Sequence, residues 1–355
     1  MIEKRKVGRT DLKISVLGFG CGPIGGLYAA VPDEQAVATV RAARDVGIGY
    51  FDTAPLYGSG LAERRLGTAL RDDIDSFVVS TKVGRLLKPL TGRAVELHRP
   101  PFEIVYDYSY DGVMRSVEDS FQRMGMTRVD LLYIHDVNRH WHGEMVEQRF
   151  VEVMEGGYRA LEKLRAEGVV KAIGAGMNDA GMLARFAEAG DFDCFMLAGR
   201  YTLLEQTPLD NLFPVCMRKS ISVVAAGPFN SGILATGATE GAKYFYKDAP
   251  AEIIAKTRAI EAVCARHGVP LAAAALRFAL GHPVVASVAT GMVSPEEVRV
   301  NKQHLARSIP DDFWQELKAG GLIRADTPVP NIIADSAAET AANRISTFIR
   351  SRPLQ

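Results

Sequence analysis

The sequence predicts a single α/β domain folded as a (β/α)8 (TIM) barrel, with an N-terminal hairpin and a C-terminal extension. Short apolar runs alternate with helical patterns, and they recur about every 25 to 35 residues, the size of one βα unit. Several runs are apolar throughout, as expected of parallel strands buried on both faces. The 355 residues suggest two domains by length alone, but no change of composition divides them. We therefore expect one barrel.

The strand and helix patterns follow each other in a fixed order. Helical patterns with clear stops include residues 33–47, where Asp33 is the expected N-cap, and residues 110–125. A further helix is expected near 311–319. The eight runs with the strand pattern are residues 15–20, 49–53, 77–82, 130–136, 169–176, 194–199, 221–227 and 284–290.

Other segments complete the expected architecture. Residues 4–15 are expected to form a hairpin that closes the floor of the barrel. Long loops follow the third and the seventh strand, at 84–109 and 227–250, and long ordered loops are often functional. The barrel is assigned to residues 1–322. The extension, 323–355, is expected to be a weak helix or a partly loose tail.

The composition disfavours several kinds of partner. The chain has 42 Lys and Arg against 42 Asp and Glu, so no net field favours nucleic acid. Its longest apolar stretch contains Arg277 and is shorter than the ~20 residues of a membrane span. No apolar core follows the charged start, so no signal peptide is expected. The four widely spaced cysteines favour reduced thiols in a cytoplasmic protein. His140 and His142 lack a third ligand nearby, so no metal is expected.

Polar residues fall at the carboxyl ends of consecutive predicted strands, where barrel enzymes place their active sites. Asp52 ends the second strand, Lys82 the third and His135 the fourth. Tyr57 follows in the loop after Asp52. Each has an ordinary explanation on its own, such as a turn cap, a solvated charge, a core histidine or a packed ring. Because all of them fall at one rim, we expect an active site there.

This set of residue types suits proton transfer between a carbonyl and an alcohol. A free tyrosine has a pKa of ~10, and a nearby lysine ammonium is expected to lower that pKa. An aspartate would hold the lysine, and a neutral histidine would orient the substrate oxygen beside the phenol. No side chain supplies hydride, so the set implies a nicotinamide cofactor.

Three motifs in the first half of the chain resemble the aldo-keto reductase superfamily: GYFDTAPLYGSGLAERRLGTAL (49–70), FVVSTKVGR (77–85) and RVDLLYIHD (128–136). The resemblance covers roughly residues 1–320. It implies that Tyr57 is the proton donor or acceptor and that Asp52, Lys82 and His135 complete a catalytic tetrad. Residues 82–90, 107–125 and 133–143 resemble more narrowly the branch of D-threo-aldose 1-dehydrogenases, L-fucose (galactose) dehydrogenases and pyridoxal 4-dehydrogenase.

The glycine pattern GFGCGPIGG (18–26) imitates a Rossmann fingerprint, which should run directly into a helix. Here Pro23 interrupts and the next helix is expected only at Asp33, so a Rossmann fold is disfavoured. Gly20 and Gly22 are instead expected to let a ligand approach the backbone at the rim.

The resemblance implies a cofactor site above strands five to eight, and this chain departs from the usual residues there. A Ser–Asn pair is replaced by Gly176 and, two positions on, Asn178, while Phe229 is a candidate for the ring that stacks on nicotinamide. The Lys and Arg that favour NADPH correspond to Gly291 and Glu297, which favours NAD over NADP by charge. Glu297 has a simpler explanation as a first-turn residue that complements the helix dipole. The expected cofactor contacts are Gly20, Gly22, Asp52, Gly176, Asn178, Gly227, Phe229, Gly232, Gly291, Ser294, Glu297 and Asn301.

The loop after the fourth strand places Trp141 and His142 near His135, and a ring face with polar edges suits a sugar or a pyridine. With Tyr57, these three are the expected substrate contacts. Three aromatic residues of the 84–109 loop either wall the pocket or pack on the barrel: Phe102, Tyr106 and Tyr108.

Three functions fit these patterns. The first is an NAD-dependent dehydrogenase that oxidises the C1 hydroxyl of an aldose such as L-fucose, D-arabinose or L-galactose to a lactone, or acts on pyridoxal. The second is an NADPH-dependent aldehyde or ketone reductase. The third is a cofactor-binding regulatory subunit with negligible turnover. The partner in each case is a small molecule, and the sequence leaves the oligomeric state open.

Overall fold

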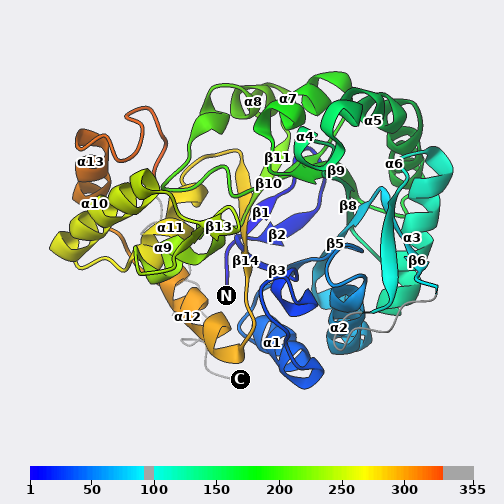
Figure 1. The fold of residues 1–355 in the computed structure, drawn as a ribbon, viewed down its shortest axis with the longest axis horizontal. Helices are drawn as coiled ribbons and strands as arrows, with labels where there is room; N and C mark the ends of the chain where they lie inside the picture. The colour runs from blue at the N-terminus through cyan, green and yellow to red at the C-terminus, as the bar shows by residue number, and fades with distance from the viewer. Residues whose placement is uncertain (92–99, 331–355) are drawn as a thin grey trace, which may run out of the picture.

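Eight parallel strands close into a barrel in the computed structural model, which describes residues 1–91 and 100–330 (Figure 1). The first and last strands meet, with Gly20 opposite Gly291. Each strand overlaps one of the eight predicted runs, which confirms the (β/α)8 barrel. The strands are β3 (Leu17–Gly20), β4 (Tyr50–Asp52), β5 (Val78–Val83), β8 (Leu131–His135), β9 (Ala172–Met177), β10 (Cys194–Ala198), β11 (Ser222–Ala226) and β14 (Val285–Gly291).

Helices surround the strands, as Figure 1 shows. Their ends follow the local sequence: in the helix Tyr110–Met124, the Ser109 side chain accepts from Gly112 N, and Gly125 takes the left-handed conformation that ends the helix. The main helices are α1 (Asp33–Asp45), α2 (Leu61–Leu70), α3 (Tyr110–Met124), α6 (Tyr158–Ala166), α7 (Ala180–Ala189), α8 (Leu212–Lys219), α10 (Ala251–His267), α11 (Leu271–Leu280), α12 (Pro295–Ala306) and α13 (Asp311–Ala319).

The start of α1 differs from the prediction. Pro32 is the N-cap residue and Asp33 is the first helical residue. The Asp33 carboxylate accepts from Arg65 Nε at 2.8 Å and therefore does not cap its own helix.

The floor of the barrel is closed by the antiparallel hairpin of β1 (Lys4–Lys6) and β2 (Lys13–Ser15), as predicted. Its apolar residues Val7, Leu12 and Ile14 are buried in one cluster with Tyr50 and Tyr133 from the strands. The opposite, carboxyl-terminal end of the barrel is therefore the face available for chemistry.

The two long loops contain secondary structure that the sequence analysis did not predict. Within 84–109, β6 (Arg85–Pro89) pairs with β7 (Phe102–Tyr106) as an antiparallel hairpin. The loop after β11 contains α9 (Ile233–Thr236) and the short pair β12 (Lys243–Tyr244) and β13 (Lys247–Asp248). In both hairpins, backbone N–H and C=O groups bond to each other, whereas in an irregular loop they would depend on solvent. The remaining short elements are α4 (Arg139–His142), α5 (Val146–Glu152), a π-helical turn (Val153–Gly157) and the 3-10 turns Pro23–Gly25, Arg71–Ser76, Gly143–Met145, Thr207–Leu209 and Asn230–Gly232.

The predicted C-terminal extension is described only in part. Residues 323–330 contain no helix or strand, although Ile323 and Thr327 are buried. Residues 331–355, for which a weak helix or loose tail was expected, lie outside the described part of the chain. Within the described ranges, no single helix is long and apolar enough to cross a membrane, and α10 and α11 reach that length only as a pair bent by 99°.

Candidate active site

Four side chains from consecutive strand ends meet at the carboxyl-terminal rim. Asp52 ends β4, Lys82 lies in β5, His135 ends β8, and Tyr57 stands in the loop after β4. Lys82 Nζ donates to Asp52 Oδ2 at 2.5 Å and lies 4.8 Å from the centre of the Tyr57 ring. The Tyr57 and His135 rings are 6.0 Å apart and perpendicular, at 89°. The structure thus brings together all four residues that the sequence analysis selected.

The Lys82–Asp52 pair is removed from solvent, with side chains 2% and 4% exposed. Lys82 Nζ also donates to Thr53 O at 2.9 Å. Gly176 lies beside the lysine stem, and a Cβ there would be in ordinary van der Waals contact, 3.6 Å from Lys82 Cε and 3.4 Å from Met196 Cβ. Gly176, predicted as a cofactor contact, therefore borders the tetrad, and its role stays a prediction.

A chain of hydroxyl groups fixes the other oxygen of Asp52. Ser80 Oγ donates to Asp52 Oδ1 at 2.7 Å, and Ser80 Oγ is 2.9 Å from Tyr50 Oη, which is 3.3 Å from Tyr133 Oη. An ionised carboxylate only accepts, so the single hydrogen of Ser80 is used on Asp52. Tyr50 must therefore donate to Ser80, and Tyr133 must donate to Tyr50. The barrel interior therefore points a line of donors at this carboxylate.

Burial and neighbouring charges together set the pKa values of the cluster. Burial raises the pKa of Tyr57 to about 12, against the lowering effect of Lys82. Lys82 lowers this pKa, as expected, but the effect of burial is larger, so the net shift is upward. Burial also lowers the pKa of Lys82, but Asp52 and Tyr57 outweigh it and raise that pKa overall. Burial, with Arg85 and Lys82, holds the pKa of His135 well below its usual range, so His135 is neutral at physiological pH.

A second charged pair, not predicted from the sequence, lies beside His135. Arg85 begins β6 and donates from Nη2 to Asp136 Oδ2 at 2.6 Å. Asp136 follows His135 and has a φ of 52°, which few side chains other than Asp and Asn accept. Asp136 Oδ2 lies 3.4 Å from His135 Nε2. An arginine directly after the Lys82 segment and an acid next to the histidine were the available signals.

The predicted substrate residues beyond the tetrad take different positions. The Trp141 ring lies over Arg85, 4.5 Å from the guanidinium carbon, and Trp141 remains 41% exposed. His142 Nε2 is 3.1 Å from Tyr108 Oη, which itself donates to His135 O at 2.7 Å. The Tyr108 hydroxyl therefore links His142 to the backbone of His135. Of the three aromatic residues of the 84–109 loop, Tyr106 stacks with Tyr108 at 6.4 Å, while Phe102 lies at the far end of the hairpin.

The predicted coenzyme residues lie around the start of α12. Ser294 Oγ accepts from Glu297 N at 3.2 Å, and Glu297 Oε2 accepts from Val293 N at 2.8 Å. Glu297 lies in the first turn, as its simpler explanation requires, and this reciprocal cap, which was not predicted, fixes its carboxylate at the helix N-terminus. A Cβ at Gly291 would lie 2.4 Å from Pro23 Cγ, so no lysine side chain fits there. Asn301 is buried on the same helix.

The other predicted cofactor residues border the same rim, and their role stays a prediction. Gly20 ends β3 and Gly22 follows it, and Gly227, Phe229 and Gly232 follow β11. Asn178 follows β9, where its oxygens accept from Arg200 Nε and Asn138 Nδ2. Asn230, which the sequence analysis did not select, is buried, and its Oδ1 has no hydrogen-bond partner in the described ranges. Buried polar groups and a capped helix N-terminus at this rim fit a nicotinamide dinucleotide.

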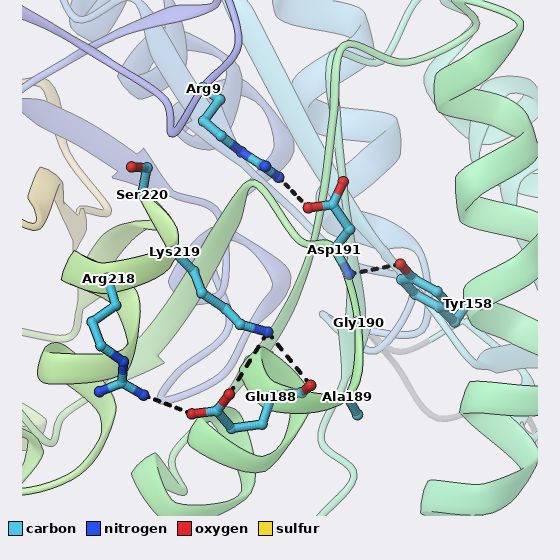
Figure 2. Close-up of a pocket in the computed structure, with 9 residues that line it drawn as sticks. All are labelled: Arg9, Tyr158, Glu188, Ala189, Gly190, Asp191, Arg218, Lys219 and Ser220. Atoms are coloured by element: carbon cyan, nitrogen blue, oxygen red, sulfur yellow. Dashed lines mark hydrogen bonds and ion pairs between the residues drawn. The ribbon is translucent and has the colours of Figure 1, made fainter.

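A hollow of about 580 Å³ lies at the opposite, amino-terminal end of the barrel (Figure 2). Arg9 there pairs with Asp191, and Arg218 pairs with Glu188 at 2.8 Å. Its charges are already matched, and it shares no residue with the tetrad. We therefore place the chemistry at the carboxyl-terminal rim.

Comparison with known proteins agrees with this geometry. The sequence profile described as "Aldo/keto reductase family" matches residues 16–320. The chain belongs to the aldo/keto reductase family. It is 44% identical over 335 residues to pyridoxal 4-dehydrogenase of Microbacterium luteolum, and the match covers 90% of this chain and 98% of that protein. It is 40% identical over 322 residues to D-threo-aldose 1-dehydrogenase of a Pseudomonas species, covering 88% and 95%.

Solved structures show the same fold. The holo form of an aldo-keto reductase from Bacillus halodurans superposes with a TM-score of 0.73 at 26% identity, over 92% of this chain and 98% of that one. The predicted family and its dehydrogenase branch are thereby confirmed. This aldo-keto reductase is an oxidoreductase that acts on CH–OH groups, and its family uses NAD(P)H.

Proposed function

We propose that this aldo-keto reductase is an NAD-dependent dehydrogenase that oxidises the C1 hydroxyl of an aldose to a lactone, with Tyr57 as proton acceptor. The observation that carries the proposal is the placement of Lys82 between Asp52 and the Tyr57 ring, with neutral His135 facing the same phenol. The 40% identity to a D-threo-aldose 1-dehydrogenase supports the substrate class.

In this reaction the substrate hydroxyl lies between Tyr57 and His135. The phenolate of Tyr57 takes the hydroxyl proton, while the Lys82 ammonium stabilises the negative charge on the phenolate. The neutral imidazole of His135 holds the substrate oxygen beside the phenol. Nicotinamide, when bound, supplies the hydride acceptor.

The charge at the start of α12 supports NAD over NADP. The Glu297 carboxylate would repel a 2′-phosphate and can accept hydrogen bonds from ribose hydroxyls. Pro23 fills the space that a cationic side chain at position 291 would need. Gly291, Ser294, Glu297 and Asn301 are therefore proposed to face the adenosine half of the cofactor.

Pyridoxal is the second candidate substrate, and the 44% identity to a pyridoxal 4-dehydrogenase favours it. Both substrates carry an aldehyde and a hydroxyl that can close to a cyclic hemiacetal, and oxidation of that carbon gives a lactone. The same Tyr57–His135 arrangement serves either ring.

A substrate panel tests the proposal. The purified protein is assayed with L-fucose, D-arabinose, L-galactose, pyridoxal and simple aldehydes, with NAD and NADP compared in each case. NADH formation with an aldose or pyridoxal supports the dehydrogenase. Activity only with NADPH and simple aldehydes would instead identify a reductase, and cofactor binding without turnover a regulatory subunit.

A further inference from the structure

The guanidinium of Arg85 is buried at the active-site rim with hydrogen-bonding capacity to spare. Its side chain is 1% exposed, and Nη2 donates to Asp136 Oδ2. Nε and Nη1 have no hydrogen-bond partner in the part of the chain that the structure describes. A buried cationic donor without an acceptor carries a large desolvation cost, so two such donors on one side chain require an explanation.

Aromatic rings hold this guanidinium but do not replace the missing acceptors. Its central carbon lies 4.5 Å from the centre of the Trp141 ring and 5.3 Å from that of Tyr106. Such contacts stabilise the cation through the ring face. The N–H groups of a guanidinium lie in its own plane, so they still need in-plane acceptors.

The Arg85–Asp136 pair extends the row of polar groups that starts at the tetrad. His135 Nε2 lies 3.4 Å from Asp136 Oδ2, which lies 2.6 Å from Arg85 Nη2. A substrate whose reacting oxygen lies between Tyr57 and His135 therefore has the Asp136–Arg85 pair next to it. For an aldose that reacts at C1, the groups beside the reacting carbon are the C2 hydroxyl and the ring oxygen, and only the hydroxyl can donate a hydrogen bond.

We propose that Arg85 and Asp136 form the subsite that recognises the hydroxyl beside the reacting carbon, the C2 hydroxyl of an aldose. A hydroxyl both donates and accepts, so it can donate to the Asp136 carboxylate and accept from a free N–H of Arg85. This subsite rests on the aldose oxidation proposed above and makes the enzyme selective for 2-hydroxy over 2-deoxy aldehyde sugars.

Two sugars that differ only at C2 test the subsite. D-arabinose and 2-deoxy-D-ribose are identical except that the second lacks the C2 hydroxyl. Losing a hydrogen bond to a charged group corresponds to about ten- to a hundredfold, so kcat/KM for D-arabinose should exceed that for the deoxy sugar by this factor. Equal values for the two sugars would overturn the proposal.

Variants of the Arg85–Asp136 pair distinguish recognition of the sugar from a structural role at the rim. Arg85→Lys keeps a cation beside Asp136 but loses the free guanidinium donors, and Asp136→Asn keeps a residue that tolerates the left-handed backbone. In both variants the ratio of kcat/KM between the two sugars should fall toward one. Arg139→Gln removes an exposed arginine from the same loop and should leave the ratio unchanged. If Arg85→Lys lowers kcat/KM equally for both sugars, the pair only stabilises the structure of the rim and the proposal is wrong.

Tryptophan fluorescence gives a readout that does not depend on turnover. The chain has two tryptophans, and Trp314 is fully buried against Phe313, so quenching by a sugar reports on Trp141. D-arabinose should bind the wild type about ten- to a hundredfold more tightly than 2-deoxy-D-ribose, and Arg85→Lys should abolish the difference. Discriminating binding without NAD reduction would refute the aldose dehydrogenase and leave the subsite standing. NAD reduction with an aldose, together with equal kcat/KM and equal binding for the two sugars, would support the aldose dehydrogenase and refute the subsite.

Discussion

The Lys82 ammonium lies 2.5 Å from the Asp52 carboxylate, and both are almost completely buried beneath the Tyr57 ring. A buried ion pair is costly unless each charge is well hydrogen-bonded. Here Ser80 holds the second carboxylate oxygen and Thr53 O accepts from the ammonium. The protein therefore maintains a fixed positive charge below the phenol, where the negative charge of a phenolate develops.

Replacing Tyr57 with Phe removes the proposed proton acceptor and leaves the ring. General acid–base groups typically contribute about 10²- to 10⁴-fold, so turnover should fall by at least that range. Cofactor binding, measured by quenching of protein fluorescence with NADH, should persist. Tyr158→Phe, at the far end of the barrel, is the matched control and should keep full activity. A Tyr57→Phe enzyme with wild-type turnover would refute the proton-transfer role.

The oxidation rate should rise with pH. Burial raises the pKa of Tyr57 to about 12, so below that pH the reactive phenolate is the minor form. Its fraction increases about tenfold per pH unit, and kcat/KM for oxidation should follow between roughly pH 7 and 10. Reduction, which uses the protonated phenol, should change little over the same range. A pH profile with a midpoint between pH 6 and 7 would instead indicate that a histidine, normally the group titrating there, limits the reaction.

Replacing Ser80 with Ala removes the hydroxyl that links Asp52 to Tyr50. Since this leaves a buried tyrosine hydroxyl and a carboxylate oxygen each short of a partner, the free energy of unfolding should fall by about 1–3 kcal/mol. Denaturant titration measures this change. Ser116→Ala is the control, because the buried Ser116 hydroxyl has no partner among the described residues and its loss should cost little. Equal stability of the two variants would show that the hydroxyl chain contributes nothing.

Replacing Glu297 with Arg should shift coenzyme preference toward NADP. The change removes a charge that repels a 2′-phosphate and adds one that binds it, and one charged hydrogen bond corresponds to about tenfold or more. The ratio of kcat/KM with NADP to that with NAD measures the shift. Glu167→Arg makes the same charge change at the other end of the barrel and should leave the ratio as it is. An unchanged ratio in Glu297→Arg would exclude Glu297 from the coenzyme site.

Periodicity was sufficient to predict the barrel because each buried parallel strand is a local apolar run. It also placed the tetrad, since Asp52, Lys82 and His135 stand at the ends of consecutive strands and the fold alone brings strand ends together. The β6–β7 hairpin was missed because 84–109, rich in Pro and aromatic residues, was expected to be one long loop, whereas its two ends pair with each other.

Contacts between distant segments were beyond sequence reasoning. The Arg85–Asp136 pair joins residues 51 positions apart and depends on the left-handed backbone of Asp136. The pKa of Tyr57 depends on its burial, which no local pattern reveals. The collision between a side chain at Gly291 and Pro23 likewise requires three-dimensional contact.

The most direct test of the central claim is the product formed from an aldose and NAD. Wild-type protein incubated with D-arabinose or L-fucose and NAD should give equal amounts of NADH and the corresponding 1,5- or 1,4-lactone, detected by absorbance and mass spectrometry, and Tyr57→Phe should give neither. Absence of NADH with every aldose and with pyridoxal, in a protein that still binds the cofactor, would contradict the proposed function.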